Sequence, residues 1–297
     1  GSVKSLISKN YGNLISGRHK TVEFFPLSFR EFLKFRGFSD FDKFSEEKEA
    51  KIKKLVEEFM HKSAFPKYVL TGDFSYVEEV FGDIIERDVK SRTEIRKKEI
   101  IDDIINLLTE RVGSLISFTK IKNILKNKGH KISTDLVIRY SSILENVFLF
   151  FFLPIYSSKY SQVVKNPRKV YIIDNGFFNL FNLNFSQNNG KLMENTVALE
   201  LLKKGWKAGK NLFYYRKSDF EVDFLIKDGL KVKQLIQVCY DIENYDTKKR
   251  ELKALIRASD ELKCNDLLVI TWDYEVEEEI NGKKIKFVPL WKWMLQN

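Results

Sequence analysis

The last third of the chain alternates between short apolar runs and longer amphipathic segments. The short runs are rich in β-branched residues and have the length of strands, whereas the longer segments place apolar residues three and four positions apart, as helices do. Asn281-Gly282 separates the last two runs and is typical of a type I′ hairpin turn. We expect helices over residues 191–204 and 247–262, and strands over residues 212–216, 221–227, 233–239, 266–271, 276–280 and 283–288.

The middle of the chain shows three helical patterns followed by two strand-like runs. Apolar residues keep helical spacing over residues 100–108, Ser117 is placed to cap a second helix, and Ser133 to cap a third. The strand-like runs cover residues 148–156 and 169–174, and the polar loop between them has the position of a wing. This order predicts a winged helix-turn-helix over residues 99–183.

Helical patterns also fill much of the first 98 residues. Pro26 ends a β-like run, and a helix that begins at Leu27 or Ser28 has Phe29, Phe32 and Leu33 on one face. A charged helical segment follows over residues 45–62, and another pattern covers residues 76–90. We divide this region into residues 1–40 and a helical linker over residues 41–98. The fold class is therefore a multi-domain α/β protein that ends in an α/β domain over residues 184–297.

Composition fits folded domains and excludes a membrane-spanning class. Of the 297 residues 43% are hydrophobic and 14% aromatic, which supports two or three cores. The longest apolar run, residues 147–153, is far too short to span a bilayer, and the chain does not begin with a secretory signal. Cys239 and Cys264 lack the spacing of a metal site or a disulfide framework. We therefore expect a cytoplasmic protein with no membrane partner; Gly1-Ser2 has the form of a scar from a cleaved tag.

Positive charge is concentrated in one segment. The net charge is +10, and residues 111–170 hold 11 Lys and Arg against two acids, Asp135 and Glu145. This concentration predicts binding to nucleic-acid phosphates, because neutralised phosphates release their counterions. The alternatives are a solvated basic surface and a winged helix that only packs between domains. The residues expected to face nucleic acid are Ser133, Thr134 and Arg139 on the recognition helix, and Lys159, Lys165, Arg168 and Lys169 in the wing.

Four polar residues of the α/β domain form a candidate catalytic site. Glu194 lies near the start of its first expected helix, Asp223 lies inside the second strand, and Gln237 and Cys239 share one face of the third. This set resembles the metal site of restriction-endonuclease-like nucleases, whose third strand carries Glu or Gln, any residue, and then Lys. The resemblance implies that Glu194 and Asp223 are the ligands of Mg²⁺, with Gln237 beside them, and that a lysine belongs at position 239 to orient the attacking water.

Cys239 stands where the resemblance calls for that lysine. A mostly neutral thiol supplies no fixed cation, so we predict a degenerate nuclease site with weak or absent Mg²⁺ binding. An alternative is an active metal-dependent DNA endonuclease with a displaced cation, for which the candidates are Lys191, Lys233, Arg216 and Lys217. A structural interpretation also stays open, in which Asp223 accepts a hydrogen bond from Tyr214 or Tyr215.

Nearly the whole chain resembles the C-terminal part of a family of archaeal and bacterial AAA-type ATPases. The passages that carry this resemblance are Gly17-Arg18 and residues 26–32, 221–224 and 236–241. It implies that residues 1–40 end the ATPase domain. The sequence has no Gly-x-x-x-x-Gly-Lys-Ser/Thr motif, so ATP is expected in the full-length protein only. By the same resemblance Arg18 contacts nucleotide in its own or a neighbouring subunit, the alternative being an ordinary salt bridge.

Three functions are consistent with these patterns. The first is the C-terminal portion of an AAA-type ATPase that binds DNA through a basic winged helix and keeps a degenerate nuclease fold. The second is an active metal-dependent DNA endonuclease, and the third is a module that assembles the ATPase. We adopt the first as the prediction, with DNA and the N-terminal ATPase domain or neighbouring subunits as partners.

Overall fold

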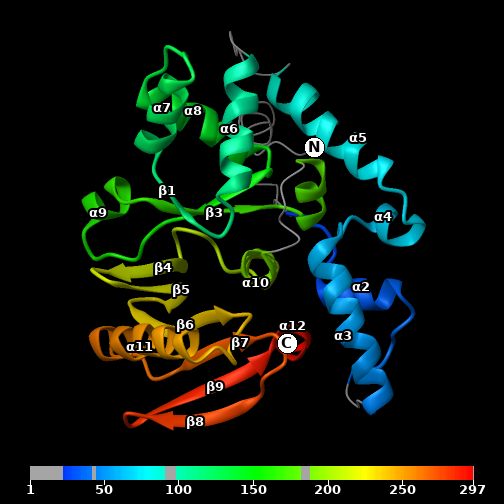
Figure 1. Cartoon of the computed structure of the whole chain (residues 1–297), viewed down its shortest axis with the longest axis vertical. Coiled ribbons are helices and arrows are strands. Elements are labelled where there is room, and N and C mark those ends of the chain that lie inside the picture. The colour runs from blue at the N-terminus through cyan, green and yellow to red at the C-terminus, as the bar shows by residue number, and fades with distance from the viewer. Residues whose placement is uncertain (1–22, 42–44, 91–97, 182–187, 297) are drawn as a thin grey trace, which may run out of the picture.

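A computed structural model describes residues 23–41, 45–90, 98–181 and 188–296 (Figure 1). Arg18 lies outside these residues, so its expected contact with nucleotide stays a prediction. The described residues form a mixed α/β structure with helices at the N-terminal end, a small sheet in the middle and a larger mixed sheet at the C-terminal end.

The described N-terminal part is helical. Its elements are α2 (Phe29–Phe35), α3 (Glu46–His61), α4 (Pro66–Thr71), α5 (Ser75–Asp83) and the π-helical turn η2 (Ile84–Lys90). Ser28 caps α2 in a capping box with Glu31, which satisfies backbone N–H groups that a helix start leaves without partners. The expected apolar face of α2 is confirmed, because Phe29, Phe32 and Leu33 are at most 1% exposed.

The middle part follows the order helix, strand, helix, helix, strand, short helix, strand. Its elements are α6 (Lys98–Glu110), β1 (Leu115–Ile116), α7 (Phe118–Asn127), α8 (Thr134–Asn146), β2 (Phe150–Leu153), the short helix α9 (Tyr160–Lys165) and β3 (Arg168–Ile172). The strands pair antiparallel in the order β1-β3-β2. Ser117 and Ser133 cap α7 and α8 as predicted. Both expected strands are shorter than predicted. The second ends at Ile172, because Asp174 caps the 3₁₀ helix η3 (Asn175–Leu180) instead of ending a strand.

The C-terminal part is a six-stranded sheet between helices. Its elements are α10 (Asn189–Lys203), β4 (Leu212–Lys217), β5 (Phe220–Asp228), β6 (Lys231–Cys239), α11 (Tyr245–Leu262), β7 (Leu267–Thr271), β8 (Val276–Ile280), β9 (Lys283–Pro289) and α12 (Leu290–Leu295). The strand order is β4-β5-β6-β7-β9-β8, with β6, β7 and β9 parallel and the other pairs antiparallel. The predicted order of strands and helices in this part is confirmed, and so is the turn, where Asn281 (φ 52°) and Gly282 (φ 73°) both adopt positive φ.

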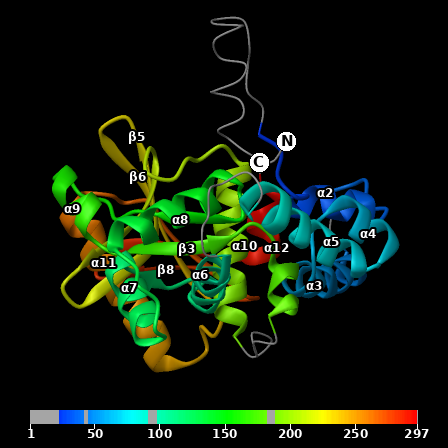
Figure 2. The same ribbon diagram turned by 90° about the horizontal axis from the view of Figure 1, so that it is seen from above.

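The sheet has one core on each face. Val222, Leu225 and Cys239 belong to the core beneath α11, whereas Phe224 and Ile236 belong to the core beneath α10 and α12. The α10 core continues without a break into the small sheet and the N-terminal helices. In Figure 2, α10 lies between these helices and the small sheet, and it contacts α3, β3, η3 and β6. Within the described ranges, no helix combines the length and apolar character needed to cross a bilayer.

Candidate functional site

The position of Asp223 depends on a β-bulge. Leu225 pairs with Phe213 and Val222 with Tyr215, so two residues of β5 stand opposite one residue of β4. A bulge of this kind turns a side chain out of the regular alternation. Here Asp223 Oδ2 accepts a hydrogen bond from the Val238 N–H at 2.9 Å, and this bond anchors the carboxylate on β6.

A lysine from the middle part lies among the acids of the C-terminal part. The Nζ of Lys169, on β3, lies 2.6 Å from Asp223 Oδ1, 3.0 Å from Glu194 Oε1 and 3.0 Å from Glu221 Oε1. The Lys169 side chain is 2% exposed. Tyr171, two residues further along β3, donates its hydroxyl to the same Oε1 of Glu194 at 2.7 Å. The structure therefore brings Glu194 and Asp223 together around a buried ammonium group.

Burial and charge act in opposite directions in this cluster. Burial alone would lower the pKa of Lys169, but the charges of Asp223 and Glu194 raise it well above its ordinary value. Burial raises the pKa of Glu194 to about 7, and the nearby Lys169 ammonium opposes that change. Lys169 therefore keeps its positive charge in the cluster. Its ammonium group also offsets the cost of burying the carboxylates, which would be far higher without a cation beside them.

The expectation that Lys169 lies in an exposed wing is wrong. The residue belongs to β3, and alternation along that strand places Lys169 and Tyr171 on the face that meets α10 and β5. The three carboxylates compensate for the loss of water around the ammonium. A two-residue period through Lys169 and Tyr171 is the signal in the sequence that indicates this inward face, but it does not indicate the partner.

The other expected nucleic-acid contacts have different surroundings. Lys159, Lys165 and Arg139 are exposed. The Arg168 guanidinium lies 5.6 Å from the ring centroid of Phe118, a cation–π contact. Ser133 is exposed and caps α8 by accepting a hydrogen bond from the Leu136 N–H; Thr134 is half-buried. The role of these six residues in nucleic-acid binding stays a prediction.

Gln237 and Cys239 share the face of β6 that meets α11, as predicted. Gln237 accepts a hydrogen bond from the Asp223 N–H at 3.3 Å and donates to Glu251 of α11. Cys239 is 3% exposed in the core beneath α11, and burial, together with the charge of Glu251, raises the pKa of its thiol to about 12. Cys239 is therefore a neutral core residue that supplies no charge.

Two of the four cations considered as replacements for the missing lysine have other partners, whereas Arg216 lines a pocket together with Asp223. Lys217 pairs with Glu261 at 3.0 Å, and Lys233 lies 5.5 Å from the ring centroid of Trp206. The structural interpretation of Asp223 is also corrected, because Tyr214 donates its hydroxyl to the Pro167 carbonyl and Tyr215 donates to Glu261. Lys169, and none of the candidates between residues 191 and 233, holds the position between the two acids.

A pocket of about 460 Å³ lies beside the cluster, between α11 and the turn that joins β4 and β5. Asp223 and Glu221 line this pocket together with Gln237 and Glu251. The basic residues that line it are Arg216, Arg250, Lys253 and Arg257. Neither Lys169 nor Glu194 is among its lining residues. The pocket therefore reaches one side of Asp223, while the carboxylate oxygen that contacts Lys169 faces the protein interior.

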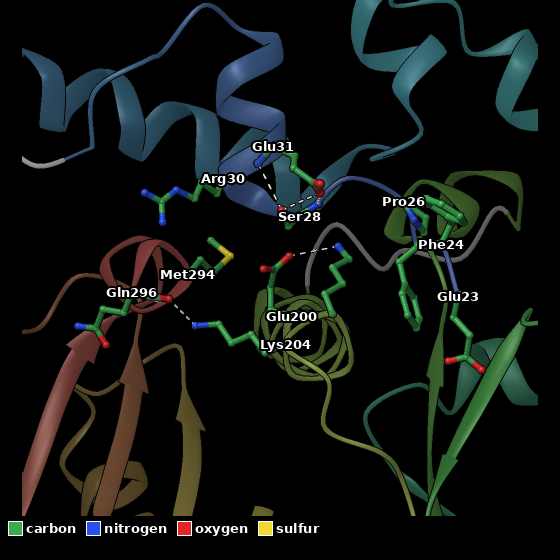
Figure 3. Close-up of a pocket in the computed structure, with 12 residues that line it drawn as sticks. Glu23, Phe24, Pro26, Ser28, Arg30, Glu31, Glu200, Lys204, Met294 and Gln296 are labelled. Carbon is green, nitrogen blue, oxygen red and sulfur yellow. Dashed lines mark hydrogen bonds and ion pairs between the residues drawn. The ribbon is translucent and has the colours of Figure 1, made fainter. Parts of the chain in front are cut away.

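A second pocket, of about 360 Å³, lies where the described chain begins (Figure 3). Several of its polar groups already have partners. Glu200 accepts hydrogen bonds from the Phe29 N–H and from Lys203, and Lys204 donates to the Gln296 carbonyl. These bonds join α2, α10 and the end of α12, so this pocket is a structural junction.

The cluster does not fit a bound Mg²⁺ ion as it stands. Mg²⁺ requires near-octahedral oxygen ligands at about 2.0–2.1 Å. The inward oxygens of Glu194 and Asp223 instead lie within 3.0 Å of one ammonium nitrogen. No group of three or more His, Cys, Asp or Glu residues suited to a metal ion occurs among the described residues. The cation between these carboxylates is therefore the ammonium group of Lys169.

Fold and site define a mixed α/β protein in which two acids of the C-terminal part, Glu194 and Asp223, surround a buried lysine. The chain is 36% identical to the uncharacterized protein MJ1544 of Methanocaldococcus jannaschii, over 99% of this chain and 68% of that protein. It is 26% identical to an uncharacterized protein of Haemophilus influenzae, over 100% of this chain and 70% of that one. The chain belongs to the family of the methanogen protein.

Two family models match the chain, and the boundary between them lies between Lys169 and the acids that it contacts. Residues 60–188 match the domain of unknown function DUF8612, and residues 189–293 match the domain of unknown function DUF4143. Lys169 lies in the first matched region, whereas Glu194, Glu221 and Asp223 lie in the second. The cluster is therefore a contact between two separately recognised domains.

Proposed function

We propose that this chain is the C-terminal portion of an AAA-type ATPase that binds nucleic acid through its middle part, and that the α/β domain is a platform that does not cut. The middle part acts as a winged helix-turn-helix, with α8 as the recognition helix and α9 in the wing. The order of its elements and its antiparallel β1-β3-β2 sheet support this assignment. The match to 68% and 70% of two longer relatives is consistent with an additional domain in those proteins.

The observation that carries the proposal is the exposed positive charge on this part. Seven exposed basic residues lie on or next to α7, α8 and α9: Lys120, Lys126, Lys128, Lys131, Arg139, Lys159 and Lys165. One of them, Lys128, is paired with Asp103 of α6. Charge of this kind favours contacts with phosphates, which hold a protein on a duplex without reading its sequence.

The lack of cutting is supported by the surroundings of the two acids. Cys239 is a neutral thiol, and Lys169 is enclosed between the two domains, where a phosphate has no access in this arrangement. The turn at Gly113 adds to the enclosure, because a β-carbon placed there would contact Glu194 Oε2 at 3.5 Å.

The contacts of Lys169 also favour a second candidate function, an active metal-dependent endonuclease in which Lys169 is the displaced lysine. It touches both acids, as a catalytic lysine would be expected to do. Incubation of supercoiled plasmid with the protein and Mn²⁺ separates the two candidates. We expect no nicking by the wild type; nicking that disappears in Asp223→Asn would establish the second candidate in place of the first.

A salt titration of duplex binding tests the nucleic-acid contact. For the wild-type chain, the logarithm of the binding constant should fall linearly with the logarithm of the salt concentration. Reversal of three exposed charges, in Arg139→Glu/Lys159→Glu/Lys165→Glu, should weaken binding at least about tenfold and reduce the slope by up to about 3, at roughly 0.9 for each lost phosphate contact.

The control reverses two exposed charges that lie outside α7, α8 and α9. Lys207 and Lys210 are exposed in the turn between α10 and β4, so Lys207→Glu/Lys210→Glu should bind almost as the wild type does. Equal losses in both variants would point to a general charge effect. Absence of duplex and single-strand binding at low salt would reject the proposed function and leave the third candidate, an assembly module.

A further inference from the structure

Three carboxylates from two different elements converge on one nitrogen atom. Glu194 comes from α10, Glu221 and Asp223 come from β5, and their oxygens lie 2.6–3.0 Å from Lys169 Nζ. Two of these carboxylates are the acids that the nuclease resemblance assigns to a divalent cation. The ammonium group therefore has the surroundings of a bound cation rather than those of one partner in a surface ion pair.

The rest of the site keeps the lysine in this position. Asp223 is anchored by the Val238 N–H, and Tyr171 donates to the oxygen of Glu194 that also contacts Lys169. Lys169 itself belongs to the central strand of the small sheet, where it pairs with Leu115 on one side and Leu153 on the other. The cation is consequently attached to a strand that is hydrogen-bonded along both edges.

The lysine and the acids belong to different domains. Other contacts cross the same junction: Tyr156 N–H donates to the Tyr214 carbonyl at 2.7 Å, and Tyr214 N–H donates to the Pro154 carbonyl at 3.1 Å. Backbone hydrogen bonds therefore hold the two domains together at this junction. Lys169 extends from the first domain into the acid site of the second.

We propose that the Lys169 ammonium takes the place of the divalent cation between Glu194 and Asp223, so that the former metal site serves as a metal-independent tie between the two domains. This inference rests on the proposed absence of cutting, and it does not depend on nucleic-acid binding. According to this proposal, the acids of the wild type do not bind a divalent ion, and the same acids bind one when the lysine charge is removed.

Binding of Mn²⁺ alone tests the proposal, with electron paramagnetic resonance as the readout and thermal unfolding as a second one. Wild type should show no site that depends on Asp223, and Mn²⁺ or a chelator should leave its melting temperature unchanged. Lys169→Met keeps the length of the side chain and removes the charge. It should gain one Mn²⁺ site per chain and a melting temperature that rises with Mn²⁺ concentration.

Two controls define the site. Lys169→Met/Asp223→Asn should lose the gained Mn²⁺ site, because one of its ligands is gone. Lys165→Met removes an exposed lysine from the same domain and should behave as wild type does. A folded Lys169→Met chain that gains no Mn²⁺ site overturns the proposal.

If Lys169→Met does not fold, Mn²⁺ binding by the wild-type chain tests the proposal. One Mn²⁺ bound per wild-type chain, and lost in Asp223→Asn, overturns the proposal, whereas absence of such a site supports it. Refolding of Lys169→Met by Mn²⁺ is a further supporting result. Duplex binding measured on the same samples keeps the two proposals distinct, since a failure of nucleic-acid binding leaves the Mn²⁺ result unaffected.

Discussion

Two charged side chains of β3 and the turn after it are buried and are held by different kinds of partner. Lys169 is held by carboxylates. Asp174 is 1% exposed and accepts hydrogen bonds from the backbone N–H groups of Ala64 and Gly176, both at 2.8 Å. Oppositely charged partners keep Lys169 ionised, whereas Asp174 has only dipoles in direct contact and the more distant charge of Lys203.

Asp174 gives the stability of the protein a specific pH dependence. Burial raises the pKa of Asp174 from 3.8 to about 6, although the two backbone hydrogen bonds oppose the change. The folded state therefore binds more protons than the unfolded state between about pH 4 and pH 6. The contribution of Asp174 to the free energy of unfolding is fully present below that range and decreases by up to about 3 kcal/mol as the pH rises through it.

Denaturant unfolding of wild type and Asp174→Asn across this range measures the effect. The free energy of unfolding of the wild type minus that of the variant should become smaller from about pH 4.5 to about pH 6.5. The control is Asp228→Asn, which makes the same substitution at an exposed position at the end of β5. A difference for Asp174→Asn that is constant or grows with pH would contradict the assignment.

Single residues were predictable from the sequence where a local rule applies. The shared face of Gln237 and Cys239 follows from the two-residue period of a strand, and the burial of Cys239 follows from its chemistry. The partner of Asp223 was not predictable, because Lys169 lies 54 positions away along the chain. No local rule states which distant lysine enters an acid site.

Helix starts and tight turns also follow from local sequence. Ser117 and Ser133 cap helices because a serine oxygen accepts a backbone N–H that the helix cannot satisfy, and this requires only neighbours in sequence. The bulge at Asp223 is different. The Asp223 carboxylate accepts a hydrogen bond from the Val238 N–H, and the Gln237 side chain accepts one from the Asp223 N–H. Both bonds depend on the adjoining strand. The presence of the β5 strand was therefore predictable from the sequence, whereas the β-bulge that orients Asp223 was not.

The β8–β9 hairpin offers a test at this level. Gly282 has φ +73°, a conformation that costs an L-residue roughly 1 kcal/mol. Gly282→Ala should lower the free energy of unfolding by about that amount. Gly82→Ala is the matched control, because Gly82 lies in α5 without positive φ and with open space around it; that change should be neutral or stabilising by up to about 1 kcal/mol. Chemical denaturation of both variants measures the difference, and equal effects would contradict the assigned turn.

In the whole molecule, α10 connects parts that the sequence analysis treated separately. Asn195 of α10 donates to the Ile172 carbonyl and accepts from the Ile172 N–H, both at 3.0 Å, and donates to Asn175 at 2.7 Å. Apolar residues of the same helix belong to the core that also contains the small sheet and the N-terminal helices. The order of the longer elements was predictable from hydrophobic periodicity, whereas the short elements β1, α9 and α12 were not. This packing was not predictable either, because it is formed by residues far apart in sequence.

This packing predicts that the C-terminal domain does not fold stably by itself. A fragment of residues 189–297 would expose the apolar side chains of α10 and leave Asn195, Glu194 and Asp223 without their partners from β3. Unpaired buried polar groups cost about 1–3 kcal/mol each and unpaired charges more, which is comparable with the total stability of a domain. We expect the isolated fragment to lack a cooperative unfolding transition by circular dichroism, and the whole chain to show one.

Addition of residues 1–188 in trans provides the control, because it returns β3 and Lys169 to the fragment. Complementation should restore a cooperative transition, and a Lys169→Met partner should restore it less well than a Lys165→Met partner does. This comparison separates the contribution of the charged tie from that of the apolar surface, since both partners carry the same core residues. A fragment of residues 189–297 that unfolds cooperatively at the same denaturant concentration as the whole chain would show that the junction adds nothing to the stability of the sheet.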